Sequence, residues 1–277
     1  MNDQHPAKFY QLKENGRISC ELCPHNCLIS DKKTGICQVR KNIDGELYSL
    51  NYGKVSSLGI DPVEKKPLYH FYPEADVLSL GSWGCNMSCD FCQNWQISQQ
   101  KPQLREYSPT KIVETALAKD INLLAFTYSE PTVFYEYMLE TAEIAQKKEL
   151  KNIMVSNGFI NEKPLKQLIP FLDAANIDLK AFNNDFYQKH CNGGLEAVKN
   201  AIKMLAEAIH LEVTTLIVTD LNDDLEELEE LFSWLADINN HIPLHLSRYH
   251  PAYKLNNPAT DLDLMKKAYQ KAKKYLD

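Results

Sequence analysis

Apolar and polar positions follow two alternating patterns along most of the chain, and these patterns predict a series of strands and helices. Short apolar runs rich in β-branched residues predict strands, whereas apolar residues at three- and four-residue steps predict helices. The predicted strands are 76–82, 122–128, 151–156, 175–180, 211–218 and 242–247. The predicted helices are 109–120, 131–148, 162–172, 194–208, 223–238 and 260–276. Strand–helix units in such a row predict an α/β fold with a parallel sheet and right-handed crossovers.

Two sheet architectures fit this order of elements. The predicted units fall short of the eight of a closed barrel, and no reversal of strand order is visible in the sequence. A partial barrel and a doubly wound sheet therefore both fit the pattern. Residues 1–74 follow other rules, because they are rich in cysteine and turns, and a hairpin is expected around residues 45–60. We divide the chain into a cysteine-rich N-terminal segment, 1–74, and a sheet domain, 75–277.

Composition and charge narrow the class of protein. Of the 277 residues, 44% are hydrophobic and 24% are charged, which is close to the average for soluble globular proteins. The net charge of −7 argues against a broad nucleic-acid footprint. No apolar run approaches the roughly 18 residues of a membrane span, and the first residues have no basic leader or apolar core of a secretory signal. We therefore expect a soluble, cytoplasmic protein with no nucleic-acid or membrane partner.

The eight cysteines are clustered rather than spread along the chain. In a reducing compartment, clustered thiols indicate metal or iron–sulfur ligands rather than a disulfide framework. Cys191 stands alone and is expected to be a small buried thiol. The two clusters are Cys20, Cys23, Cys27 and Cys37, and Cys85, Cys89 and Cys92.

The second cluster suits a catalytic iron–sulfur site. A cubane cluster takes four ligands, normally thiolates. Cys85, Cys89 and Cys92 would hold three irons and leave the fourth open, and an open metal position marks a site that performs chemistry. Structural zinc fits less well, because it requires four closed ligands. An interpretation as three buried thiols on a turn fits even less well, since Gly84 and Asp90 mark an exposed loop.

The spacing of this loop resembles that of a known superfamily. Cys85-x3-Cys89-x2-Cys92, with Phe91 just before the last cysteine, resembles the signature of the radical S-adenosylmethionine (radical SAM) superfamily. The run Gln93-Asn94-Trp95 that follows resembles the activating-enzyme branch, which includes pyruvate formate-lyase activase.

A narrower resemblance covers nearly the whole chain. The runs 61–73, 84–86 and 92–98 resemble the radical enzyme of the AmmeMemoRadiSam system. Together with the row of strand–helix units, this resemblance favours a partial (β/α)6 TIM-like barrel over residues 75–277, behind the cysteine-rich segment.

The resemblance implies an activity. Such an enzyme reductively cleaves S-adenosylmethionine (SAM) at a [4Fe-4S] cluster to a 5′-deoxyadenosyl radical, which abstracts hydrogen from a substrate. The implied electron donor is a low-potential protein of the flavodoxin or ferredoxin type. The activating-enzyme branch implies a glycyl residue of a partner protein as the substrate. The alternatives are radical modification of a small molecule and a non-catalytic iron–sulfur or zinc protein.

The resemblance also implies SAM contacts at the carboxyl ends of the strands, where α/β folds place their sites. Glu130, with Ser129 before it, stands where relatives have a Gly-Gly-Glu-type turn, and Tyr128 and Ser129 replace the glycines. The alternative role of Glu130 is a carboxylate at a helix N-terminus. Asn157 matches the asparagine of a Thr-Asn-Gly turn in relatives, and its alternative role is that of a plain turn residue.

Three further SAM contacts are implied on later strands. Alternation places Asp178 and Lys180 on one side of a strand. Opposite charges that face a barrel interior are costly unless they pair with each other or bind a ligand. Relatives use this Asp-x-Lys near the SAM carboxylate and ribose, and a strand-end ion pair is the alternative. His245 resembles a histidine that activases place beside the SAM adenine or ribose, and a satisfied core histidine is the alternative. Alternation does not decide which side of strand 211–218 faces inward.

The first cysteine cluster offers four thiolates for a closed site. A structural zinc ion ranks first, because a metal would help a small, loop-rich segment to fold. A second iron–sulfur cluster ranks close behind, since both kinds of metal accept thiolates at such spacing. Four free thiols without a metal rank third. The ligands in question are Cys20, Cys23, Cys27 and Cys37.

Overall fold

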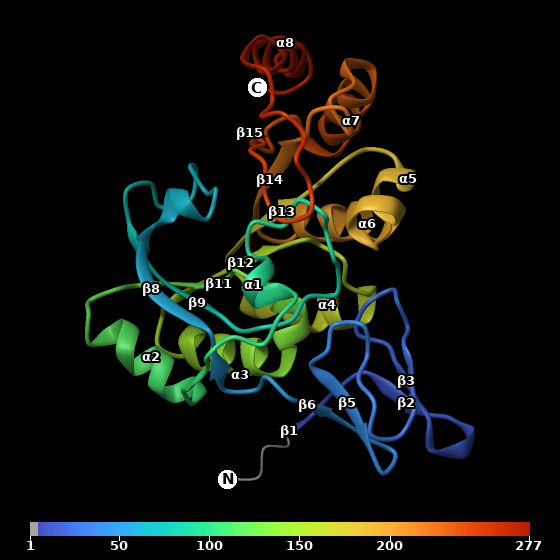
Figure 1. Ribbon diagram of the computed structural model, residues 1–277. Coiled ribbons are helices and arrows are strands. Elements are labelled where there is room, and N and C mark those ends of the chain that lie inside the picture. The colour runs from blue at the N-terminus through green and yellow to red at the C-terminus, as the bar shows by residue number, and fades with distance from the viewer. Residues whose placement is uncertain (1–4) are drawn as a thin grey trace.

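The computed structural model describes residues 5–277. At its centre lies a seven-stranded sheet with the strand order β15-β14-β13-β12-β11-β9-β8 (Figure 1). From β9 to β15 the neighbouring strands are parallel and follow one another along the chain. Because the order of the described strands never reverses, the sheet is an open (β/α)6 barrel and not a doubly wound sheet. The predicted partial barrel is confirmed.

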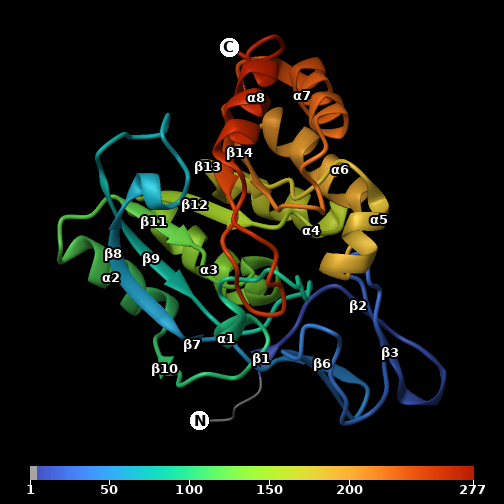
Figure 2. The same cartoon turned by 45° about the horizontal axis from the view of Figure 1, so that its top comes forward.

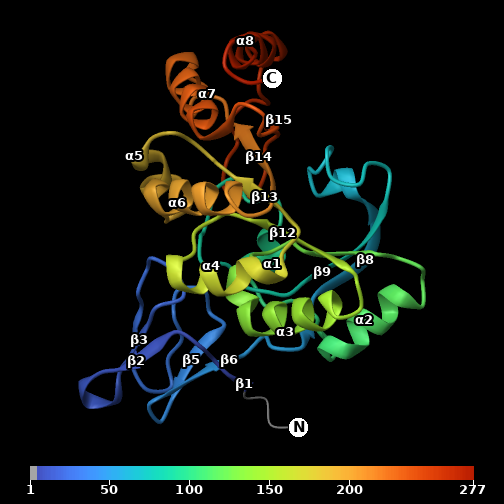
Figure 3. The ribbon, with the colours of Figure 1, turned by 180° about the vertical axis from the view of Figure 1, so that it is seen from behind.

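The parallel strands and the helices of the barrel agree closely with the predicted ranges, whereas the antiparallel edge strand β8 was not predicted. The strands are β8 (Ser57–Pro62), β9 (Asp76–Gly81), β11 (Leu123–Phe126), β12 (Lys151–Ser156), β13 (Ala174–Asp178), β14 (His210–Ile217) and β15 (Leu244–Arg248). The helices are α2 (Pro109–Leu117), α3 (Tyr135–Gln146), α4 (Glu162–Leu168), α6 (Leu195–Ala206), α7 (Leu225–Asn239) and α8 (Leu262–Ala272). Seen from behind, α2, α3, α4 and α6 cover one face of the sheet (Figure 3). Across the described part of the chain, no helix has the length and apolar character to cross a membrane.

Local signals explain where these elements begin. The Ser108 hydroxyl accepts a hydrogen bond from the Lys111 N–H at 3.2 Å, and Pro109 occupies the first turn of α2. Asp224 and Asp261 cap α7 and α8 in the same way. The strands are apolar because both faces of the sheet are covered, and all four residues of β11 are buried.

The shorter elements were not predicted. They include α1 (Trp95–Ser98), α5 (Asn184–Phe186) and the single-turn helices η2 (Val63–Lys65), η3 (Pro131–Phe134), η4 (Ile169–Phe171) and η5 (Tyr187–Cys191). The small strands are β1 (His5–Pro6), β2 (Tyr10–Leu12), β3 (Ile18–Cys20), β4 (Leu28–Ile29), β5 (Arg40–Ile43), β6 (Glu46–Ser49), β7 (Lys54–Val55) and β10 (Arg105–Glu106). Most of the small strands form two antiparallel sheets at one end of the barrel, away from α7 and α8 (Figure 2).

The hairpin expected around residues 45–60 is wrong. Those residues contribute to three different sheets: β6 pairs with β1 and β5, β7 pairs with β10, and β8 pairs antiparallel with β9. Between β6 and β7, the Asn51 side chain donates to the Trp83 carbonyl of the barrel at 3.2 Å. The edge strand of the central sheet thus comes from the segment before residue 75.

A buried ion pair fastens the N-terminal segment to the barrel. The Nη1 atom of Arg40 lies 3.0 and 3.1 Å from the two carboxylate oxygens of Glu136 on α3. The same carboxylate accepts the backbone N–H of Lys8 at 2.8 Å. Each of the paired side chains is only 2% exposed. Removing one partner would leave an uncompensated charge in the interior.

We expect Glu136→Gln to lower the free energy of unfolding by about 3–5 kcal/mol, because the Arg40 charge would stay buried without its counter-ion. Chemical denaturation measures the loss. The matched control on the same helix is Glu143→Gln, which breaks an exposed pair with Lys147 and should change stability little. Equal losses in the two variants would contradict the role assigned to the buried pair.

Candidate active site

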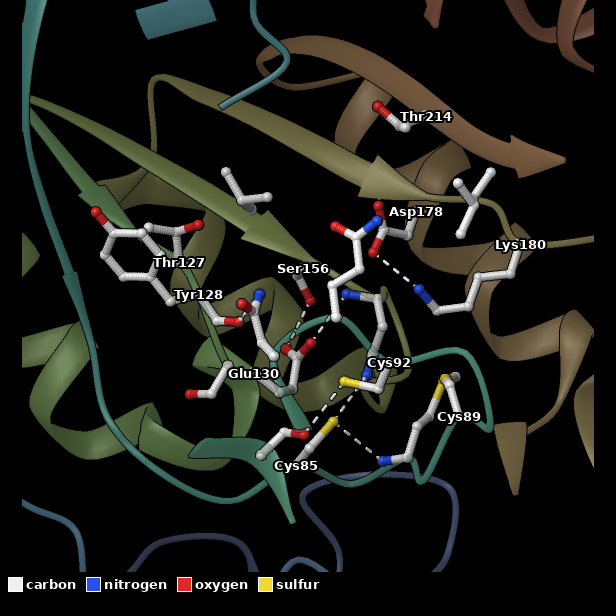
Figure 4. Close-up of a pocket in the computed structure, with 18 of the residues that line it drawn as sticks. Cys85, Cys89, Cys92, Thr127, Tyr128, Glu130, Ser156, Asp178, Lys180 and Thr214 are labelled. Carbon is white, nitrogen blue, oxygen red and sulfur yellow. Dashed lines mark hydrogen bonds and ion pairs between the residues drawn. The ribbon is translucent and has the colours of Figure 1, made fainter. Parts of the chain in front are cut away.

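A cavity of about 610 Å³ opens at the carboxyl ends of the barrel strands. Figure 4 shows the cysteines of the loop after β9 on one side, Glu130 beside them, and Asp178 and Lys180 at the end of β13 across from them. The structure brings together most of the residues predicted for the site, although they come from four different strand ends. The predicted residues that line the cavity are Cys85, Cys89, Cys92, Ser129, Glu130, Asn157, Asp178 and Lys180.

The loop of residues 85–92, here called the radical loop, rests on η5. The Ser88 N–H donates to the Cys191 carbonyl at 2.9 Å, and the Asp90 N–H donates to the His190 carbonyl at 2.9 Å. Cys191 is fully buried, and its thiol is hydrogen-bonded to that of Cys89. The sequence predicted a small buried thiol at Cys191, but it held no signal that η5 supports the radical loop.

The surroundings of these sulfurs fit an iron–sulfur cluster. The Cys85 sulfur accepts the Met87 N–H at 3.3 Å and the Asn157 side-chain amide at 3.7 Å. The Ser98 hydroxyl lies 3.3 Å from the Cys92 sulfur. Burial raises the pKa of both Cys85 and Cys92. A bound cluster would offset this effect, because metals bind the thiolate form of cysteine. Hydrogen bonds to the sulfurs are one means by which proteins tune the reduction potential of such clusters.

Glu130 is held rigidly at the wall of the cavity. One carboxylate oxygen accepts the Thr132 N–H at 2.9 Å and the Ser156 hydroxyl at 2.7 Å. The other oxygen accepts the Asn157 N–H at 2.9 Å. Burial raises the pKa of Glu130 although these hydrogen bonds favour its charged form. The role at a helix N-terminus, which the sequence offered as an alternative, is therefore present, and the same carboxylate also lines the cavity.

Tyr128 keeps the backbone conformation that a glycine would adopt. Its φ of 70° lies in the left-handed region, which is uncommon for a tyrosine. The Tyr128 hydroxyl donates to Asp61 at 2.6 Å, and the Lys66 ammonium lies 4.6 Å from the centre of its ring. These contacts offset the strain. The turn before Glu130 thus has a glycine-like conformation at Tyr128.

Asp178 and Lys180 form an ion pair of 2.8 Å that faces the cavity. Burial opposes the charged form of Lys180, but Asp178 and the nearby thiols of Cys89 and Cys191 raise its pKa well above the usual value. The Asp178 side chain remains 40% exposed, so part of this pair is open to a ligand. On β14, Thr214 and Leu216 line the same cavity, and so their side of the strand faces inward.

His245 lines a neighbouring cavity, which shares Pro67 and Ser247 with this one. It is absent from the lining described for this cavity, and its Nε2 atom lies 2.6 Å from a carboxylate oxygen of Glu212. Glu212 is fully buried and also meets His210 Nε2 at 2.9 Å and the N–H groups of Tyr69 and His70 at 3.1 and 2.8 Å. A buried carboxylate needs such donors, which explains the position of His245. Sequence reasoning missed Glu212, whose only signal was a charge within an apolar strand.

We expect the hydrogen bonds to Glu212 to make the stability of the protein depend on pH. Burial raises the pKa of Glu212, but the donors from His210, His245 and the backbone outweigh burial and hold the pKa well below its usual range. The stabilisation is therefore complete above the unfolded-state pKa of about 4.3 and is lost as the pH falls below it. We expect Glu212→Gln to lower the free energy of unfolding by about 1–3 kcal/mol at pH 7. The deficit should shrink in denaturation curves recorded towards pH 3, and a deficit independent of pH would contradict this account.

The four cysteines of the N-terminal segment also meet at one place. They line a second, small cavity together with Arg40 and Asn86, and all four are free thiols. Burial raises the pKa of three of them. Within residues 5–277, no group of three or more His, Cys, Asp or Glu side chains forms a ready site for a single metal ion. This N-terminal thiol set consists of Cys20, Cys23, Cys27 and Cys37.

Comparisons with known proteins agree with this geometry. The family model of the radical SAM superfamily matches residues 82–235. An uncharacterized protein of Methanocaldococcus jannaschii, MJ0808, is 44% identical over 95% of this chain and 80% of its own length. A putative glycyl-radical enzyme activating enzyme of the same organism, MJ1632, is 26% identical over 73% of this chain and 79% of its own. The crystal structure of a radical SAM methyltransferase from Sphaerobacter thermophilus shares the fold, with a TM-score of 0.56 and 14% identity over 99% of this chain and 75% of that chain.

Proposed function

The chain belongs to the radical SAM superfamily, and from this premise we propose that its cavity cleaves SAM reductively and directs the resulting radical at a substrate. Proteins of this superfamily use a [4Fe-4S] cluster and SAM. When bound, the cluster supplies the electron that splits the sulfonium carbon–sulfur bond of SAM into methionine and a 5′-deoxyadenosyl radical. The proposed cluster ligands are Cys85, Cys89 and Cys92.

One observation carries this proposal: the three thiols share a cavity with a fixed carboxylate and a partly open ion pair. Three thiolates leave one position of a four-iron cluster for the amine and carboxylate of SAM. In our proposal, Glu130 accepts a hydrogen bond from the methionyl ammonium, and Ser129 lies beside it. Glu130 is suited to this role because its hydrogen bonds fix it before the ligand arrives.

The other SAM contacts in the proposal come from β12 and β13. Lys180 supplies a positive charge for the methionyl carboxylate, and Asp178 accepts hydrogen bonds from the ribose hydroxyls. Asn157 acts differently, because its side-chain amide already donates to Asn86 at 2.9 Å and to the Cys85 sulfur. We therefore propose that Asn157 positions the radical loop.

For the substrate, we propose a glycyl residue of a partner protein. The similarity to a putative glycyl-radical enzyme activating enzyme supports this class, as does the Gln93-Asn94-Trp95 run after the radical loop. The motif at 61–73 also supports the narrower AmmeMemoRadiSam group, and its residues Lys65 and Lys66 line the cavity. The electron would come from a protein of the flavodoxin or ferredoxin type.

We further propose that residues 1–74 and 75–277 act as two parts, a metal-binding segment and the catalytic barrel. The N-terminal thiol set lies in the first part and the radical loop in the second. The pairing of β8 with β9 and the Arg40–Glu136 ion pair hold the two parts together.

The decisive experiment is an assay for 5′-deoxyadenosine. Anaerobically reconstituted protein, reduced with dithionite, should release 5′-deoxyadenosine and methionine from SAM, and protein without dithionite should not. An intact, reduced cluster that binds SAM and yields no 5′-deoxyadenosine would overturn the proposal. Transfer of deuterium from a deuterated glycyl peptide into 5′-deoxyadenosine would then support a protein substrate. Transfer of deuterium from deuterated small molecules alone would exclude a protein substrate.

A further inference from the structure

We propose that the N-terminal thiol set binds a second metal centre through four thiolates, separate from the cluster of the radical loop. The four thiols come from β3 and from the loops on either side of β4, yet they line one enclosed cavity. They are free thiols and not disulfide halves. Zinc and iron–sulfur clusters share this ligand chemistry, since both bind sets of four thiolates. The ligands are Cys20, Cys23, Cys27 and Cys37.

Backbone hydrogen bonds fix the loops that carry these cysteines. The Cys20 N–H donates to the Cys27 carbonyl oxygen at 2.9 Å, and the Asn26 N–H donates to the Cys23 carbonyl oxygen at 3.1 Å. The Gly35 N–H donates to the Arg40 carbonyl oxygen at 2.9 Å, which closes the turn around Cys37. The fold of the segment therefore holds the four thiols at one place.

Arg40 provides the second, independent observation. The residue is only 1% exposed and lines the thiol cavity beside Cys20 and Cys37. Its two terminal nitrogens already donate hydrogen bonds, Nη1 to Glu136 and Nη2 to the Lys8 carbonyl oxygen. The Nε atom has no hydrogen-bond partner among the residues that the structure describes. A buried donor without a partner is costly, and the positive charge of Arg40 favours the thiolate form of the cysteines in this cavity.

The second centre lies directly behind the radical loop. His25 Nε2 is 2.7 Å from the Asn86 carbonyl oxygen, and Asn86 lines the thiol cavity. Gly84 has a φ of 87°, and a Cβ atom there would lie 2.6 Å from the Cys37 carbonyl oxygen. The N-terminal segment thus packs so closely on the start of the radical loop that no side chain fits between them. A metal that holds this segment in shape would also position the radical loop.

A set of four thiolates suits a zinc ion and an iron–sulfur cluster alike. Within residues 5–277, neither the N-terminal thiol set nor the radical loop forms a ready site for a single ion, and proteins of this superfamily use a cluster.

Metal analysis of the whole protein tests the proposal. Reconstituted wild-type protein should contain either one zinc besides about four irons, or about eight irons with matching sulfide. Cys27→Ala should lose only the second metal centre and keep about four irons, the content of one cubane cluster. The matched control is Lys33→Ala, which changes an exposed side chain of the same segment and should keep the full metal content. Wild-type protein with four irons and no other metal would overturn the proposal.

A second measurement uses the wild-type protein and so tests the proposal even if Cys27→Ala does not fold. Native protein should protect these four thiols from alkylation by iodoacetamide until a chelator removes the second metal. Immediate reaction of these thiols in native, cluster-loaded protein would also overturn the proposal. Both readouts are independent of SAM cleavage, so a failure of the proposed function would leave this result unaffected.

Discussion

Each of the variants Cys85→Ala, Cys89→Ala and Cys92→Ala should abolish SAM cleavage. The three thiols are the protein ligands proposed for the cluster, and three is the number that leaves one iron open, so none is spare. We expect 5′-deoxyadenosine to fall below detection in each variant. The visible absorbance of the cluster should fall with it, because the thiolate-to-iron bands depend on the same bonds. The assay is the dithionite-dependent release of 5′-deoxyadenosine after anaerobic reconstitution.

Cys191→Ala is the matched control for these variants. Its thiol is buried and contacts Cys89, but it is not part of the lining of the cavity. Cluster absorbance and SAM cleavage should both persist in Cys191→Ala. If that variant loses its cluster while Cys89→Ala keeps it, the ligand assignment is wrong. Full SAM cleavage by any of the three ligand variants would also refute it.

The sequence predicted the barrel because its strands are covered on both faces. Continuous apolar runs such as the one in β11 and amphipathic helices between them are local patterns, which one chain displays without knowledge of its contacts. The meeting of Glu130, Asp178 and Lys180 at one cavity could be predicted too, because parallel strands bring their carboxyl ends to the same edge.

The missed features all depend on contacts between distant parts of the chain. Glu212 accepts the N–H of Tyr69, which is 143 positions away in the sequence. The same buried carboxylate also holds the imidazole of His245 at 2.6 Å. The left-handed Tyr128 depends on Asp61 in the same way. Propensity and spacing do not encode such partners, so these features required the structure.

Asp178→Asn and Lys180→Ala should weaken SAM binding while the cluster still assembles. Neither residue is a proposed iron ligand, and their 2.8 Å pair faces the cavity at the carboxyl end of β13. A hydrogen bond to a charged group contributes about 1.5–3 kcal/mol. The dissociation constant for SAM should therefore rise by roughly 10- to 100-fold in each variant. Titration of the reconstituted protein with SAM, followed by the electron paramagnetic resonance signal of the reduced cluster, measures this change.

The control for this pair is Lys151→Ala, at the opposite end of the same sheet. Lys151 pairs with Asp173 at 2.9 Å, just before β13 begins, so the variant removes a comparable ion pair that lies far from the carboxyl ends of the strands. SAM affinity should stay at the wild-type level in Lys151→Ala. If Asp178→Asn and Lys180→Ala also bind SAM like the wild type, their ion pair is structural. The ligand must then contact other residues of the cavity, such as Arg248 or Ser247, which line it from the end of β15.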